Sequence, residues 1–248
     1  MVSDSSPGVS DVPAGVRRRN PAAVALLGGL AAGLVAFGLG EVLYGWFPEA
    51  GESGSLNGAP VVLNTARTHA IATTRNAALE YAVLGCGLGL VMGLAGGLAG
   101  GDLRRGVAAG SFGLLLGGLA GAGLPLALVR PFLSYYQAQV YQDMMIPLAM
   151  HGTFWGVLGL IGGLAFGIGR GRGGIARLAI LGLVGALVGT AVYEVVGIFL
   201  DPLAETAEPL SKTVATRLLA RMAVALGTAA TIALGLDGTP PGGTRTPK

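Results

Sequence analysis

The chain has 248 residues, of which 52% are hydrophobic and only 12% are charged, and its formal net charge is +3. Soluble globular domains carry about 25% charged residues, so this composition excludes an ordinary soluble protein. The mean hydropathy of +0.67 instead favours a lipid bilayer as the surroundings. We expect no nucleic-acid partner. Cys86 is the single cysteine, which excludes an intramolecular disulfide and a cysteine metal cluster.

Six stretches are apolar and long enough to cross the roughly 30 Å hydrocarbon core of a bilayer as helices. They are residues 22–46, 76–100, 106–130, 146–169, 175–200 and 213–236. We therefore predict an all-α polytopic membrane protein whose single membrane domain covers residues 17–237. Residues 1–16 and 238–248 are rich in Pro, Gly, Ser and Thr, and this composition predicts disordered tails.

The basic residues are distributed unequally over the two ends of the predicted helices. One end carries Arg17, Arg18, Arg19, Arg104, Arg105, Arg170, Arg172, Arg177, Arg245 and Lys248; the other carries Arg67, Arg75, Arg130, Lys212 and Arg217. Cytoplasmic loops of membrane proteins are enriched in Lys and Arg. We therefore predict a multi-pass protein of the cell membrane with both termini in the cytoplasm.

Weak self-similarity recurs at a spacing of about 71 residues. Pro60, Pro131 and Pro202 share this spacing, and so do Gly85, Gly156 and Gly227. The pattern predicts three helical hairpins related by a threefold internal repeat. A chain rich in Gly and Ala also produces such matches by chance, and the sequence leaves both interpretations open.

Glycines recur at every fourth position within the predicted helices. The rows are Gly85, Gly89, Gly93 and Gly97; Gly113, Gly117 and Gly121; and Gly159, Gly163 and Gly167. This spacing places each row on one helix face, where two backbones can approach closely. Lipid supplies no hydrophobic force between helices, so we interpret the rows as packing faces rather than as the lining of a pore.

Six ionisable residues lie inside or at the ends of the apolar stretches, and the topology places all of them at one depth near the outer side. They are Glu41, Glu80, His151, Glu194, Arg217 and Arg221. A charged residue costs about 2.5–3.5 kcal/mol at the centre of a membrane helix. The six residues therefore either form ion pairs, for example Glu41 or Glu194 with Arg221, or line an outward-facing vestibule for a small solute, ion or proton.

Aromatic residues accompany these ionisable residues. All tyrosines and tryptophans map to the same half of the predicted bundle: Tyr44, Tyr81, Tyr135, Tyr136, Tyr141, Tyr193, Trp46 and Trp155. In the stretch from Pro131 to Met144, Phe132, Tyr136 and Val140 recur at four-residue spacing. This pattern predicts a short helix lying on the outer surface.

The leading functional prediction is a small-solute or ion transporter that uses the six ionisable residues as its pathway. The alternative is a non-catalytic scaffold or assembly subunit whose glycine faces dock partner helices or a second copy. We predict no enzyme: Ser111 and His151 fall at different depths and could not act together, which argues against an intramembrane serine protease. The predicted helices contain no Glu-x-x-His motif, which would indicate a metal centre, and we expect no cofactor.

Overall fold

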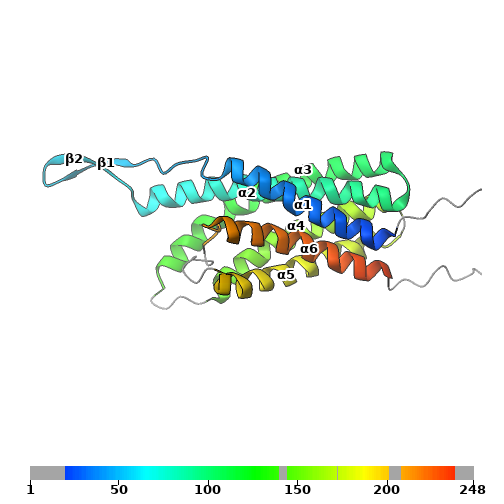
Figure 1. Ribbon diagram of the computed structural model, residues 1–248. Helices are drawn as coiled ribbons and strands as arrows, with labels where there is room; N and C mark the ends of the chain where they lie inside the picture. Colours follow the sequence, from blue (N-terminus) through cyan, green and yellow to red (C-terminus); the bar gives the residue numbers. More distant parts are fainter. Residues whose placement is uncertain (1–19, 140–143, 172, 201–207, 238–248) are drawn as a thin grey trace, which may run out of the picture.

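The computed structural model describes residues 20–139, 144–171, 173–200 and 208–237. These residues form six helices and one two-stranded hairpin (Figure 1). In chain order the elements are α1 (Pro21–Leu43), β1 (Glu52–Leu56), β2 (Ala59–Leu63), α2 (Ala66–Gly100), α3 (Leu103–Gln137), α4 (Met145–Arg170), α5 (Ile175–Leu200) and α6 (Val214–Asp237). The two predicted tails, residues 1–16 and 238–248, lie outside the described residues.

All six helices are long and apolar enough to span a membrane. Each contains a window of 18 residues whose mean hydropathy lies between 1.5 and 2.2. In hydrocarbon, backbone groups have no water to bond to, so a spanning segment must satisfy them internally as a helix does. The chain is an integral membrane protein.

Two helices are longer than predicted. The helices α2 and α3 contain 35 residues each, which corresponds to about 52 Å at 1.5 Å per residue. The helix α2 begins at Ala66 because Thr65 and Thr68 form a capping box there, not at residue 76, where the apolar stretch starts. The helix α3 continues through Pro131 to Gln137, so the separate surface helix predicted from Pro131 is wrong, and its last residues, 140–143, lie outside the described part.

A β-hairpin between α1 and α2 was not predicted. The strands β1 and β2 pair antiparallel, and Asn57 and Gly58 form the turn with positive φ angles of 53° and 84°. An Asn-Gly pair is the preferred connection of a two-residue hairpin because both residues tolerate positive φ. The hairpin projects beyond the helices at one end of the bundle (Figure 1). We call this end the hairpin end, and the opposite end, where α1 begins and α6 finishes, the terminal end.

Five helices pack in a closed order. The helix α1 contacts α2, α2 contacts α4, α4 contacts α5, α5 contacts α6, and α6 returns to α1. The remaining helix, α3, packs against α2 and α4. Contact between α2 and α4 is extensive whereas contact between α4 and α6 is slight, so the packing does not reveal a threefold equivalence, and the internal repeat stays a prediction.

Several glycines of the predicted rows lie close to the backbone of a neighbouring helix. A Cβ atom added at Gly89 of α2 would overlap the backbone of Gly113 in α3, and one added at Gly85 would overlap that of Gly117. The same holds at Gly93, Gly97 and Gly121 between α2 and α3, and at Gly159 and Gly163 between α4 and α5. At Gly167 the added atom would lie against Ile175. Side chains at most of these positions would force the helices apart.

Candidate functional site

The six ionisable residues named from the sequence come from five different helices and lie together at the hairpin end. Each of them contacts another member of the set, and we call the group the polar layer. Its members are Glu41 (α1), Glu80 (α2), His151 (α4), Glu194 (α5), and Arg217 and Arg221 (α6). All except Glu41 are buried, with relative exposures of 9% or less.

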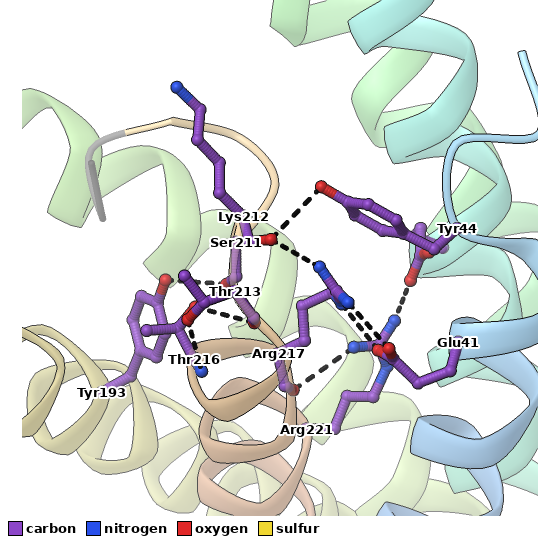
Figure 2. A network of polar contacts seen from close by, with 10 residues as sticks. Glu41, Tyr44, Tyr193, Ser211, Lys212, Thr213, Thr216, Arg217 and Arg221 are labelled. Carbon is purple, nitrogen blue, oxygen red and sulfur yellow. Dashed lines mark hydrogen bonds and ion pairs between the residues drawn. The ribbon is translucent and has the colours of Figure 1, made fainter. Parts of the chain in front are cut away.

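The first pair joins α1 to α6. Arg217 Nε donates a hydrogen bond of 2.6 Å to Glu41 Oε1, and Nη2 donates one of 2.7 Å to Oε2 (Figure 2). The guanidinium also lies 3.7 Å from the centre of the Tyr44 ring. The helix α1 ends at Leu43, not at residue 46, so Glu41 lies closer to the helix end than predicted. The bidentate contact between Arg217 and Glu41 is the strongest form of an arginine–carboxylate contact.

The second pair joins α2 to α6. Arg221 Nη2 donates to Glu80 Oε2, and both side chains are buried. Arg221 Nη1 also donates to the backbone carbonyl of Arg217 at 3.3 Å. The other carboxylate oxygen, Glu80 Oε1, is buried and has no hydrogen-bond partner among the described residues. An ionised carboxylate has room for several acceptor contacts, so this oxygen can still receive a donor.

The third pair joins α4 to α5. His151 Nδ1 lies 2.8 Å from Glu194 Oε1, and its Nε2 lies 3.1 Å from the backbone carbonyl oxygen of Glu208. The Trp155 ring stacks on the imidazole at 5.1 Å, and the Tyr193 ring meets it edge-on at 5.7 Å. The histidine is thus held in position by two polar and two aromatic contacts.

These pairings differ from the ones suggested from the sequence. Pairing of Glu41 or Glu194 with Arg221 is wrong: Glu41 binds Arg217, Glu194 binds His151, and Arg221 binds Glu80. Glu41 and Arg217 lie on helices that are neighbours in the closed order, and so do His151 and Glu194, whereas Glu80 and Arg221 lie on α2 and α6, which are not neighbours. Sequence spacing reveals neither the order of the helices nor the face that each turns inward.

A segment just before α6 covers the polar layer. We call residues 208–213 the cap segment. Its polar anchors come from the C-cap of α1 and from the other four helices of the closed order. Tyr44 donates to the Lys212 carbonyl at 3.5 Å, Arg217 donates to the same carbonyl at 2.6 Å, and Tyr193 bonds Ser211 at 2.8 Å (Figure 2). In addition, Tyr81 donates to the Pro209 carbonyl at 3.0 Å, and His151 contacts the Glu208 carbonyl. The sequence showed that the tyrosines share this depth but not that their hydroxyls bind one segment.

Two hollows border the cap segment, and we call the one lined by residues of the polar layer the inner hollow and the other the outer hollow. The inner one has a volume of about 40 Å³ and is lined by Glu80, Trp155, Ser211 and Arg221 among others. The outer one has a volume of about 210 Å³ and is lined in part by Tyr44, Asn76 and Lys212. Leu210 borders both hollows. Since a cavity needs only about 10–15 Å³ of such volume to hold a water molecule, the inner hollow has room for water.

Metal binding finds no support in the described part of the chain. No group of three or more His, Cys, Asp and Glu side chains gathers there in a way that could hold a metal ion. Comparison with models of known protein families, with curated proteins and with solved structures found no match to this chain.

Proposed function

We propose that this membrane protein transports a small solute or ion through the polar layer, with the cap segment as the gate. The observation that carries the proposal is that two hollows border the cap segment: one of about 210 Å³ on the side of the β-hairpin and one of about 40 Å³ beside the polar layer, with Leu210 lining both. We expect such an arrangement of a gated site in its closed state. Displacement of the cap would join the two hollows.

The chemistry of the polar layer supports the proposal. Charged groups inside membrane helices are costly and most often mark substrate, ion or proton pathways. Glu80 Oε1 is left without a partner beside the inner hollow, so a hydrogen-bond donor entering there finds an open acceptor. Glu41 and Glu80 balance Arg217 and Arg221 in charge, so a neutral or proton-carrying passenger adds the least uncompensated charge.

The charge distribution supports an orientation as well. With both termini in the cytoplasm, as the Lys and Arg bias favours, the hairpin end and the outer hollow face the outside of the cell. The glycine contacts of α2 with α3 lie between the polar layer and the terminal end. We propose that they close the inner half in this state.

The scaffold alternative would require a docking surface other than the glycine faces predicted from the sequence. The glycine faces proposed for docking are met by neighbouring helices of the same chain: Gly89 lies against Gly113, and Gly159 against Gly182. A partner helix or a second copy could reach those glycines only after the bundle had opened. This observation favours the transport proposal over assembly through the glycine rows.

We expect the double substitution Glu41→Gln, Glu194→Gln to abolish transport while the protein still folds. Glutamine keeps the shape of the side chain but removes the charge that balances Arg217 and the acceptor strength that His151 requires. Purified protein in liposomes can be assayed with trapped pyranine for proton flux, with radioactive sodium, and with a panel of amino acids and sugars. Glu52→Gln on the exposed strand β1 is the matched control and should transport normally. Wild-type rates in the folded double variant would exclude this pathway.

A further inference from the structure

The contacts of His151 set its protonation. One of its ring nitrogens faces a carboxylate, Glu194 Oε1, and the other faces a backbone carbonyl, that of Glu208. A carbonyl oxygen can only accept a hydrogen bond, so Nε2 must carry a hydrogen. Nδ1 and Glu194 must then share a further hydrogen, since two bare acceptors 2.8 Å apart would repel each other. Whether that hydrogen lies on the ring or on the carboxyl, the pair holds one proton more than an ionised Glu194 beside a neutral His151.

The geometry points to His151 and Glu194 as a proton-binding site whose bound proton keeps the cap segment closed. A neutral histidine has a single N–H, so it can satisfy only one of its two acceptors. The ionised carboxylate of Glu194 is the stronger acceptor and retains that N–H. The Glu208 carbonyl then faces a bare ring nitrogen, and the first anchor of the cap is lost. Protonation closes the cap, and loss of the proton releases it.

Among the residues that the structure describes, no other group nearby is placed to take over this proton without breaking a contact of its own. The described charged and titratable groups at this end of the elements packed against α4 are Arg67, His69, Arg75, Glu80 and Tyr81 of α2, Arg130, Tyr135 and Tyr136 of α3, Tyr193 of α5, Arg217 and Arg221 of α6, and the cap residues Glu208 and Lys212. Glu80 and Arg221 bind each other, and Arg217 binds Glu41. Glu208 binds Lys212 at 2.8 Å, and the Tyr81 hydroxyl is used by Pro209. Arg130 is exposed.

Because His151 and Glu194 are buried, we expect the cap segment to stay closed only while this pair holds its proton. The side chains of His151 and Glu194 are exposed by only 2% and 12%, and an unbalanced charge in so dry a position is costly. Loss of the proton would leave one net negative charge between α4 and α5, which favours entry of water and therefore opening. For transport this means that the controlling or coupled ion is a proton. That last step rests on the function proposed above, whereas the proton-binding site does not.

The test measures how fast a polar maleimide that does not cross membranes labels a cysteine placed at Ala220. Ala220 of α6 lines the inner hollow and is not an anchor of the cap segment, and it is replaced in a Cys86→Ser background. Maleimide reacts with the thiolate, so pH changes the rate at any cysteine. A second protein with the exposed Ser55→Cys in β1 supplies the reference rate. We expect the ratio of the two rates to rise in one step by about tenfold as the pH is raised, because one cap anchor is lost with the proton.

Two variants remove the step if the proton-binding site is correct. In Glu194→Gln the amide can donate to Nδ1 while Nε2–H still donates to Glu208, so the cap should stay closed at every pH and label slowly. In His151→Gln no titrating ring remains, and the ratio should not vary with pH. His69→Gln is the matched control, because His69 forms the other His–Glu pair, 2.7 Å from Glu49, on the exposed side. This variant should retain the step.

The possible outcomes separate the two proposals. A flat ratio in the wild-type background, or a step that persists in Glu194→Gln, would overturn the proton-binding site even if transport is measured. A step that disappears in Glu194→Gln together with no uptake of any tested solute or ion would support the proton-binding site and refute transport. If His151→Gln fails to fold, Glu194→Gln still decides the outcome.

Discussion

Replacing Glu80 with alanine should lower the free energy of unfolding by about 3–5 kcal/mol, the usual cost of leaving one partner of a buried ion pair alone. The Arg221 side chain is only 7% exposed, and Glu80 is its ion-pair partner. Without Glu80, the guanidinium charge would stay buried with no carboxylate to balance it. Thermal unfolding of the purified protein in detergent, followed by circular dichroism, measures the loss.

Two comparisons show that this loss comes from the unpaired charge. The double substitution Glu80→Leu, Arg221→Met removes both charges and should restore most of the stability, since apolar residues often replace a buried pair without loss. Glu49→Ala breaks a pair with His69 whose side chains are 34% and 39% exposed, and it should cost less than about 1 kcal/mol. Equal losses for Glu80→Ala and Glu49→Ala would mean that the Glu80–Arg221 pair is open to water.

Adding one methyl group at Gly89 should destabilise the protein by about 2–3 kcal/mol, at the upper end of the usual cost of overpacking. The new Cβ would overlap the backbone of Gly113, and a backbone cannot rotate aside as a side chain can. The helices α2 and α3 would have to separate along their length. The midpoint of thermal unfolding of Gly89→Ala reports the change.

The same substitution at Gly123 of α3 should have the opposite effect. No atom lies within 4 Å of a Cβ built there, so only the backbone preference remains, and alanine favours a helix over glycine by about 1 kcal/mol. A pair of variants with the same chemical change thus separates close helix packing from helix propensity. If both variants unfold at the same temperature, the contact between α2 and α3 does not depend on missing side chains.

The polar layer explains why so many costly groups are found at one end of an otherwise apolar bundle. Its ion pairs join α1 to α6, α2 to α6 and α4 to α5, and the groups around them bind the cap segment. The cap segment, the unpartnered Glu80 Oε1 and the two hollows that border the cap are the features from which we propose a gated site.

The amino-acid sequence predicted the features that depend on the solvent. The bilayer demands about 20 apolar residues for each crossing, so the six helices could be read from hydropathy, although the ends of α2 and α3 could not. Hydropathy shows where a helix enters lipid, whereas the Thr65 capping box and the continuation through Pro131 determine where these helices begin and end. The Asn57-Gly58 pair is a local turn signal for the β-hairpin, and a hydropathy pattern does not contain that signal.

The sequence by itself thus determined the membrane class and the common depth of the six ionisable residues, because both follow from the cost of polar groups in hydrocarbon. Only the tertiary structure decided that Glu41 binds Arg217, that Glu80 binds Arg221, and that residues 208–213 cover them. Depth depends on position along one helix. Pairing depends on the order of the helices and on the way each is turned about its axis, and those are set by contacts between segments far apart in the chain.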